Sequence, residues 1–435
     1  MTVIAFLIGV VLLVVGLAAS IALHELGHLL PAKRFGVRVG QYMIGFGPTL
    51  WSKRFGETEY GVKAIPLGGY ISMAGMYPPS PRAADGADGK AGGGFFATMV
   101  QDARTANDET LADAAEHWAF YELPVWRRVV IMLGGPVMNL LFAIVLFAIV
   151  FSGIGVQTAT TTIASVNECV LPADSTQTEC AADDPASPAA AAGVLPGDEI
   201  VSVDGTAVGT FAEASAIIQA APNRTLDLVV RRDGAEQTLH VTPMLAERQV
   251  LGADGEVTTA EVGFVGMTAQ VAYVAQPIWS GPEAAIAQAG QVVGIIWQLP
   301  AKVYQTAADM VTGAERDPNG PLSVVGVGRL AGEVAATDAP ILNRVAGLLT
   351  LLGSLNIALF VFNLIPLLPL DGGHIVVALW DGLKRAWAKL TGRRAPRPVD
   401  ATRLVPVTFV VVIALIGMSA VLILADIVNP VNLFG

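Results

Sequence analysis

The residues best suited to chemistry lie near the end of the first apolar segment, where the sequence reads His24-Glu25-Leu26-Gly27-His28. On a helix, side chains four positions apart share a face, so the imidazoles of His24 and His28 can reach one metal ion. Glu25 follows the first histidine and can point toward a water molecule beside that ion. This arrangement predicts hydrolysis assisted by one zinc ion, with His24 and His28 as ligands and Glu25 as the catalytic base.

The alternative for this motif is a helix that only buries two histidines in its core. That interpretation is disfavoured because the motif lies at the inner end of an apolar segment long enough to span a membrane. Ionisable groups inside a membrane are costly, so those that are present usually serve a function.

A catalytic zinc ion needs a third protein ligand, and the third apolar segment offers one. Between Asn363 and His374 this segment contains two prolines and a Gly-Gly pair, which must break a helix. Asp371 lies at the break. The first and third segments cross the membrane in opposite directions, which brings Asp371 to about the same membrane depth as the two histidines. We therefore expect Asp371 as the third ligand. His374 is the rival, for which we expect a structural or supporting role.

The composition places these motifs in a membrane protein. Of the 435 residues, 53% are hydrophobic and 14% are charged, which is too apolar for a soluble domain of this size. The apolar residues gather in four blocks of membrane-spanning length, about 2–23, 129–152, 345–380 and 404–428. A signal peptide is disfavoured for the first block because no Lys or Arg precedes it and no small-residue cleavage site follows it. Nothing in the sequence resembles a basic surface for nucleic acid, so no nucleic-acid partner is expected.

Cationic residues set the expected orientation of the four spans. Lys33 and Arg34 follow the first span, Arg127 and Arg128 are expected at the membrane interface before the second, and residues 381–403 form a strongly basic loop. Cytoplasmic loops are enriched in Lys and Arg, so both termini are expected outside and the active site toward the cytoplasmic side. The lipid bilayer is thus an expected partner of the chain.

The segment after the first span reads as short strands with glycines between them. The strand-like segment Val62 to Ile71, which contains Gly68-Gly69-Tyr70, is a candidate edge to which an unwound substrate could add a strand. A simple loop turn is the alternative, because Gly-Gly pairs commonly mark turns.

The external segment between the second and third spans contains a compact soluble region. Its Leu195-Pro196-Gly197-Asp198 run, followed by strands and one helix, resembles a PDZ domain, a fold that binds peptides by adding a strand to a sheet edge. Cys169 and Cys180 lie just before it in a polar loop. An external location permits a disulfide between them, and two free thiols are the alternative.

The sequence therefore predicts an α-helical polytopic membrane protein with four transmembrane helices, an inserted extracytoplasmic PDZ-like α+β domain and a short membrane-associated β-hairpin or sheet. The expected parts are a first transmembrane helix (1–30), a β-hairpin region (31–76), a flexible cytoplasmic insert (77–124), a second transmembrane helix (125–152), the PDZ-like domain (153–245), an extracytoplasmic membrane-surface and substrate-entry region (246–340), a third transmembrane helix (341–380), a basic cytoplasmic loop (381–403) and a fourth transmembrane helix with its tail (404–435).

Over nearly its whole length the chain resembles the site-2 protease family of intramembrane metalloproteases. The resemblance is carried by the His-Glu-x-x-His motif, the external PDZ-like insert and two further stretches, Asn363 through Gly372 and Gly134-Gly135-Pro136-x-x-Asn139. The chain resembles the actinobacterial regulated intramembrane proteases in particular. This likeness rests on the two-cysteine loop and on the stretch Gly45-Phe46-Gly47-Pro48-Thr49-Leu50-Trp51.

The resemblance implies that His24, His28 and Asp371 bind zinc, that Glu25 is the base, and that Asn363 helps to hold the substrate backbone. It also implies a bacterial plasma-membrane enzyme that cleaves transmembrane segments of single-span proteins, such as anti-sigma factors, after a first cut outside. The chain departs from the family in its long insert at residues 77–115 and in having one recognisable PDZ unit where some relatives carry two. The glycines, proline and asparagine of the second span are expected to serve packing first.

Two other classes of function are weighed against the protease. A metal transporter would need further polar residues along the spans, and the fourth span has no charge before Asp426. An inactive PDZ scaffold would need neither Glu25 nor a complete set of metal ligands. The sequence therefore favours the zinc metalloendopeptidase.

Overall fold

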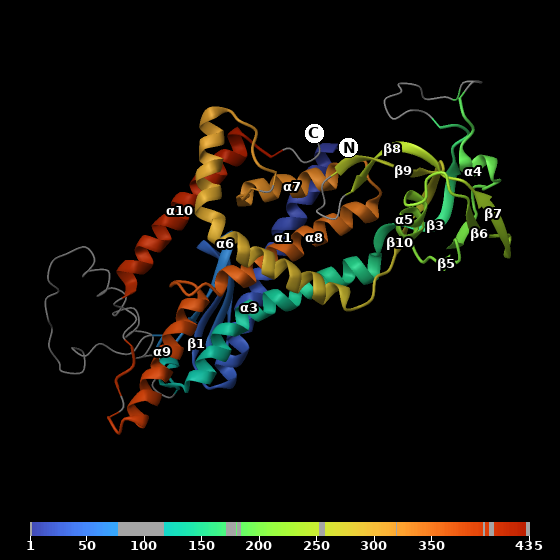
Figure 1. The fold of residues 1–435 in the computed structure, drawn as a ribbon. Helices are drawn as coiled ribbons and strands as arrows, with labels where there is room; N and C mark the ends of the chain where they lie inside the picture. The colour runs from blue at the N-terminus through green and yellow to red at the C-terminus, as the bar shows by residue number, and fades with distance from the viewer. Residues whose placement is uncertain are drawn as a thin grey trace. The chain divides into compact units, whose positions relative to one another are not determined.

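The computed structural model describes residues 2–76, 117–170, 180, 184–251, 257–318, 320–394, 396–399 and 404–431. The chain divides into two compact units, one formed by Met1–Gly153 with Pro277–Gly435 and the other by Ile154–Gln276. The first unit is mainly helical and the second is mainly β-strand (Figure 1). The insert expected at residues 77–115 lies outside the described residues.

Helices form most of the first unit. They are α1 (Thr2–Arg34), α3 (Val125–Ala148) with the π-helical turn η2 (Ile149–Ile154) after it, α6 (Ser280–Thr312), α7 (Val324–Ala336), α8 (Ile341–Asn363), α9 (Asp371–Leu390) and α10 (Val405–Val428). Within the described part of the chain, four stretches are long and apolar enough to cross a membrane: Val3–Arg34, Val125–Ile154, Ile341–Asn363 and Val405–Val428. The prediction of a multi-pass membrane protein with four apolar spans is therefore confirmed.

The third predicted span, residues 345–380, is two helices rather than one. α8 ends at Asn363 and α9 begins at Asp371, with a turn-rich segment between them. Pro366 and Pro369 lie in this segment, and a proline has no backbone N–H to donate and disfavours a helical residue before it. Of the two helices, α8 alone is apolar enough to span a membrane, because α9 also carries charged residues.

α1 and α3 bring their backbones into near contact at Gly27 and Gly134. A Cβ atom on Gly27 would lie 2.2 Å from the carbonyl oxygen of Gly134, so glycine is required for this approach. A cluster of buried apolar side chains surrounds the contact and includes Leu29, Ala32, Val37, Val39, Ile131 and Met132. A second buried cluster joins α3, α6 and α8 through Ala143, Phe147, Ala285, Ile357 and Val361.

The strands β1 (Val39–Phe55) and β2 (Thr58–Met73) form a sheet in which the first half of β1 pairs on both sides. Met43 pairs with both Gly61 and Tyr70, whereas Arg54, in the second half of β1, pairs with Glu59. The sheet therefore contains four neighbouring segments, in the order 49–55, 58–63, 39–44 and 69–73. Segment 69–73 lies at one edge.

Two glycines allow β1 to bend between its halves. Gly45 has a φ of 93° and Gly47 a φ of 83°, a left-handed conformation that costs glycine little. A Cβ atom on Gly45 would also lie 2.8 Å from the carbonyl oxygen of Ile65. The hairpin expected within residues 31–76 corresponds to this bent sheet.

Strands and two short helices make up the described part of the second unit. Its elements are β3 (Val156–Val166), α4 (Pro188–Ala191), β4 (Glu199–Val203), β5 (Thr206–Ala207), α5 (Phe211–Gln219), β6 (Leu226–Arg232), β7 (Ala235–Val241), β8 (Met244–Leu251), β9 (Val257–Phe264) and β10 (Met267–Val274). The main sheet has the order β10-β3-β4-β6-β7, with β5 beside β4, and β8 pairs with β9 separately. Because β10 pairs with β3, this unit extends past the predicted PDZ-like segment 153–245 to Gln276.

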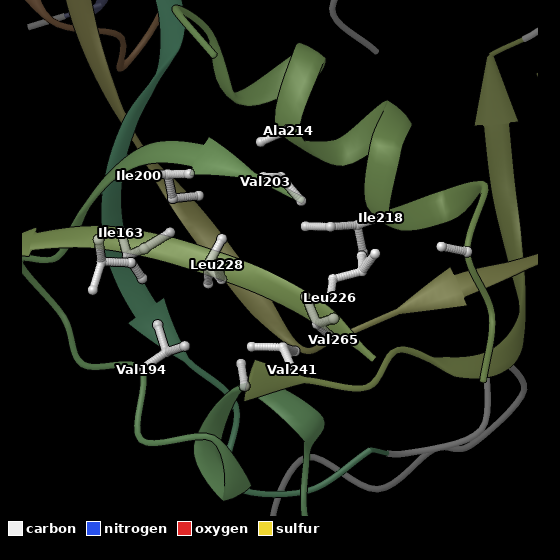
Figure 2. Close-up of a cluster of buried hydrophobic side chains, with 13 residues drawn as sticks. Ile163, Val194, Ile200, Val203, Ala214, Ile218, Leu226, Leu228, Val241 and Val265 are labelled. Carbon is white, nitrogen blue, oxygen red and sulfur yellow. The ribbon is translucent and has the colours of Figure 1, made fainter. Parts of the chain in front are cut away.

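Alternation along β6 creates the core of the second unit. Leu226, Leu228 and Val230 point to one face and are buried, as a strand with a period of two requires. Ala214 and Ile218, four positions apart on α5, are buried in the same cluster (Figure 2).

Polar and covalent links close two loops of the second unit. Arg232 donates to both carboxylate oxygens of Asp198 at 2.7 Å, and the backbone N–H of Leu195 donates to Asp198 at 2.9 Å. The Arg232 guanidinium holds the pKa of the Asp198 carboxyl below its usual range. Cys169 and Cys180 are joined by a disulfide, the pairing expected from the sequence.

Candidate metal centre

Three side chains from two helices converge on one point in the first unit. Nε2 of His24 and Nε2 of His28, both on α1, lie 3.2 Å apart. Oδ2 of Asp371, the first residue of α9, lies 3.3 Å from Nε2 of His24 and 3.4 Å from Nε2 of His28. Within the described ranges this is the one group of three His, Cys, Asp or Glu side chains close enough to share a metal ion.

The size of this triangle fits a tetrahedral zinc ion. Zinc bonds nitrogen and oxygen at about 2.0–2.1 Å, so tetrahedral ligands lie about 3.3–3.4 Å from one another. Oδ2 of Asp371 is also buried and accepts no hydrogen bond from any described residue. Acceptors that converge in a buried place fit a cation between them, and this donor set is one that zinc prefers.

The orientation of His28 is fixed by a backbone carbonyl. Its Nδ1 lies 2.7 Å from the carbonyl oxygen of Ile131 on α3. A carbonyl can only accept, so Nδ1 of His28 carries the proton and donates it. The lone pair of Nε2 is then free to face Asp371 and a metal ion, which is how buried partners usually orient a histidine ligand.

Asn139 on α3 supports the other histidine. Its side-chain Nδ2 lies 3.2 Å from Nδ1 of His24, while its Oδ1 is buried without a partner among the described residues. An imidazole that offers Nε2 to a metal carries its proton on Nδ1. A half-turn of the amide exchanges its nitrogen and oxygen, and Oδ1 of Asn139 then accepts that proton.

The glycine pair of α3 makes room for the histidines. A Cβ atom on Gly135 would lie 2.3 Å from Nε2 of His28 and 2.8 Å from Cε1 of His24. The sequence led us to expect packing first from Gly134, Gly135 and Asn139. They do pack α3 against α1, but Gly135 and Asn139 also border the imidazoles themselves, which sequence reasoning undervalued.

The start of α9 presents Asp371 to the two histidines. A helix N-terminus carries partial positive charge, which favours a carboxylate in its first turn. The preceding segment folds closely over this end, since a Cβ atom on Gly372 would lie 2.4 Å from the carbonyl oxygen of Leu364. His374, the rival ligand, lies one turn further along α9 and lines the same cavity, but it is not one of the three converging side chains.

The three side chains border a cavity of about 360 Å³. Glu25 is buried and lines it beside them. The residues that the sequence suggested for substrate, Gly68, Gly69, Tyr70 and Asn363, also line this cavity. Ile71, the last residue of the expected edge segment, lines it too. Sequence reasoning missed the remaining walls, Ile21, Met73, Met76, Met132, Leu359 and Pro369, because such residues carry no signal that separates them from ordinary core positions.

The other two histidines lie away from this cavity. Nε2 of His117 lies 3.2 Å from a carboxylate oxygen of Glu57, and Nδ1 of His240 lies 2.8 Å from one of Asp227 in the second unit. Neither lines the cavity or joins the group of three.

Known proteins are similar in sequence to this chain over nearly its whole length. The model of peptidase family M50 matches residues 12–399, which include all three side chains of the metal centre. The chain is 33% identical to the zinc metalloprotease Rip1 of Mycobacterium tuberculosis and 34% identical to that of Mycolicibacterium smegmatis, over 99% of each chain in both cases. It is 29% identical to the metalloprotease MmpA of Caulobacter vibrioides over 88% of both chains. The resemblance to the site-2 proteases is thereby confirmed, and the chain belongs to peptidase family M50.

Proposed function

We propose that this chain is a zinc metalloendopeptidase that cleaves transmembrane segments of single-span membrane proteins. The observation that carries the proposal is the triangle of His24, His28 and Asp371, with Glu25 in the same cavity, on helices of a multi-pass membrane protein. Relatives named as zinc metalloproteases match the chain from end to end, which supports the same conclusion.

Each polar residue of the cavity has a distinct role in this proposal. His24, His28 and Asp371 hold the zinc ion, and the Ile131 carbonyl and Asn139 orient the two imidazoles. When bound, zinc supplies a Lewis acid that polarises the scissile carbonyl and makes water nucleophilic at neutral pH. Glu25 accepts the proton of the attacking water and returns it to the leaving amine.

The edge segment 69–73 supports a mode of substrate binding. A transmembrane helix hides its carbonyls in its own hydrogen bonds, so it must unwind before it is cut. An unwound segment that pairs with Gly69 and Tyr70 at this edge would pass along the cavity wall beside Glu25. Asn363 lines the same cavity, where its side-chain amide, which donates to the carbonyl of Leu359 at 3.0 Å, would help to hold the substrate backbone.

The positions of the charged residues support the proposed orientation in the plasma membrane. Lys33 and Arg34 lie in the last turn of α1, less than two turns beyond His28. By the enrichment of cations in cytoplasmic segments, the metal centre faces the cytoplasmic side and both termini lie outside. The basic residues at the end of α9 and after it agree with this orientation.

We assign a PDZ-like role to the second unit. Its strands, its single longer helix α5 and its Leu195-to-Asp198 turn agree with that fold. A peptide or substrate contact there would let the unit act as a size filter, so that only proteins already cut outside, such as anti-sigma factors, reach the cavity. Deletion of residues 158–245 should then permit cleavage of uncut substrates, and an unchanged substrate range would refute the filter.

One experiment tests the central claim. The purified full chain, Glu25→Gln and Asp371→Ala are compared for zinc content and for cleavage of a single-span reporter. The unaltered chain should bind about one zinc and cleave. Glu25→Gln should keep zinc but lose cleavage, and Asp371→Ala should lose both. Cleavage retained by Glu25→Gln would overturn the proposal, and a metal transporter would retain its metal-dependent transport in that variant.

A further inference from the structure

A buried ion pair joins α3 to α9, the helix that begins with Asp371. Nη1 of Arg128 lies 3.1 Å from Oδ2 of Asp381, and the two side chains are 5% and 2% exposed. Arg128, which the sequence led us to expect at the membrane interface, is thus buried within the protein against a partner that the sequence did not identify. The arginine is buried because a carboxylate from 253 positions further along the chain faces it.

The second oxygen of the Asp381 carboxylate also has partners. Its Oδ1 accepts from the backbone N–H of Val399 at 2.8 Å and lies 3.3 Å from Nζ of Lys384. The guanidinium of Arg128 lies 5.6 Å from the centroid of the Phe120 ring, which is itself buried. Both side chains of the ion pair therefore have further contacts that hold them in place.

A series of contacts through α3, α1 and α9 connects the ion pair with the metal centre. Arg128 lies one turn before Ile131 on α3, and the Ile131 carbonyl holds His28 of α1. Asp381 lies on the same helix as Asp371, whose Oδ2 lies 3.4 Å from Nε2 of His28. α9 is therefore held at two places along its length, by the ion pair and by the metal centre.

The two helices also approach closely at the level of the pair. A Cβ atom on Gly382, the residue after Asp381, would lie 3.1 Å from Cγ2 of Val125 on α3. In this close contact Asp381 of α9 is the carboxylate that faces Arg128 of α3. Apolar contacts along a helix can slide past one another, whereas a buried ion pair loses its interaction when its partners shift.

We propose that Arg128 and Asp381 are positioning residues for the metal centre. Their ion pair sets the position of α9 along α3, and so sets where the Asp371 carboxylate lies relative to His24 and His28. Metal–ligand distances tolerate a change of only about 0.2 Å, so a small slip of α9 weakens the third ligand. The proposal rests on the proposed function for its assignment of these three residues as ligands.

The test measures metal affinity rather than proteolysis. The full chain in detergent is titrated with Co²⁺, whose absorption spectrum reports the geometry of its ligands, and with Zn²⁺ in competition with a chelating dye. Asp381→Asn removes the charge of the pair and keeps the size of the side chain. It should weaken affinity for both ions about tenfold or more, as loss of a ligand-supporting contact does, and should change the Co²⁺ spectrum.

The chain offers a matched control in a second buried ion pair. Arg316 pairs with Asp426 of α10, with side chains 2% and 1% exposed, and Asp426 also accepts from the backbone N–H groups of Ser323 and Gly326. α10 carries none of the three metal-centre side chains. Asp426→Asn should therefore disturb a pair of the same kind without changing the metal affinity or the Co²⁺ spectrum.

Four outcomes would each overturn the proposal. Unchanged metal affinity in Asp381→Asn, or an equal loss in Asp426→Asn, overturns the positioning role. If Asp381→Asn does not fold, the double variant Arg128→Met with Asp381→Leu replaces the pair with apolar side chains, which buried sites commonly tolerate. That folded variant should still bind metal about tenfold more weakly, and unaltered affinity would overturn the role. Absence of metal binding by the unaltered chain contradicts the proposed function itself, and the positioning role with it.

Discussion

The side-chain amide of Asn139 lies 3.2 Å from Nδ1 of His24, across the contact between α3 and α1. The pair links the middle of one apolar helix to a side chain of the metal centre on another. Asn139 is fully buried, and its free Oδ1 is the one acceptor that the proton on Nδ1 of His24 needs.

Replacement of this asparagine should weaken the metal site. Asn139→Leu keeps the branched shape of the side chain but removes the acceptor, so His24 loses the contact that orients its ring. We expect zinc affinity to fall by about 10–100-fold, measured by competition with a chelating dye. The control is Asn356→Leu, which removes another fully buried amide that bonds Ser20 of α1 but contacts neither histidine. Equal losses in the two variants would assign the effect to packing.

A single methyl group at Gly135 should block the site. Its Cβ would lie 2.3 Å from Nε2 of His28, in the space where a metal ion meets that nitrogen. Gly135→Ala should therefore abolish zinc binding, measured by metal analysis of the purified chain. Gly417→Ala on α10 is the control, because a Cβ there meets no atom within 4 Å. Normal zinc content in Gly135→Ala would show that the helices part easily and that the glycine is not required.

A change at Gly69 should separate substrate binding from metal binding. A Cβ atom there would lie 2.8 Å from Cγ2 of Ile21 and 3.0 Å from Cγ of Glu25, inside the cavity wall. Gly69→Ala should lower kcat/KM for a single-span reporter by about 100-fold, because displacing a catalytic group by about 1 Å has that effect. Zinc content should stay unchanged. Gly40→Ala lies in the same sheet, and its Cβ would approach no atom closer than Oγ of Ser72 at 3.9 Å. This variant should cleave normally, and a loss there would point to a general fault in the sheet.

The second unit should lose stability in acid through Asp198. Its pKa is depressed by Arg232, so the stabilisation is fully present above the ordinary Asp pKa of about 3.9 and is lost as the pH falls through the lower folded-state value. The protection factors of the β4 and β6 amides against hydrogen exchange in the full chain should therefore fall on acidification below about pH 4. Asp198→Asn should cost about 1.5–3 kcal/mol near neutral pH and remove this dependence. An unchanged acid dependence in the variant would assign it to other carboxylates.

Much of the metal centre follows from the sequence because its parts obey local rules. The spacing of His24 and His28 brings both imidazoles to one helix face whatever surrounds them. Asp371 could be found because prolines and glycines announce the break between α8 and α9. The break was expected within one span of residues 345–380, since an apolar run does not reveal that its second part is a separate helix.

Features that depend on distant pairings could not be predicted in the same way. Nothing near Arg128 in the sequence identifies Asp381 as its partner, so the arginine looked like an ordinary interfacial cation. The bend of β1 at Gly45 and Gly47 was visible as glycines, but the order of the four sheet segments depends on register, which alternation of side chains leaves open. The pairing of β10 with β3 likewise joins strands about 100 residues apart and extended the second unit past its expected end.

The identity of the three converging side chains has a consequence for the electrical balance of the bilayer. A zinc ion brings two positive charges, Asp371 and Glu25 bring one negative charge each, and two histidines that donate through Nδ1 remain neutral. These formal charges sum to zero, so the loaded centre needs no counter-ion from lipid or water. The empty centre would leave two buried carboxylates uncompensated between apolar helices, at a large cost in solvation free energy. The metal thus makes the interior of the protein electrically compatible with the membrane around it.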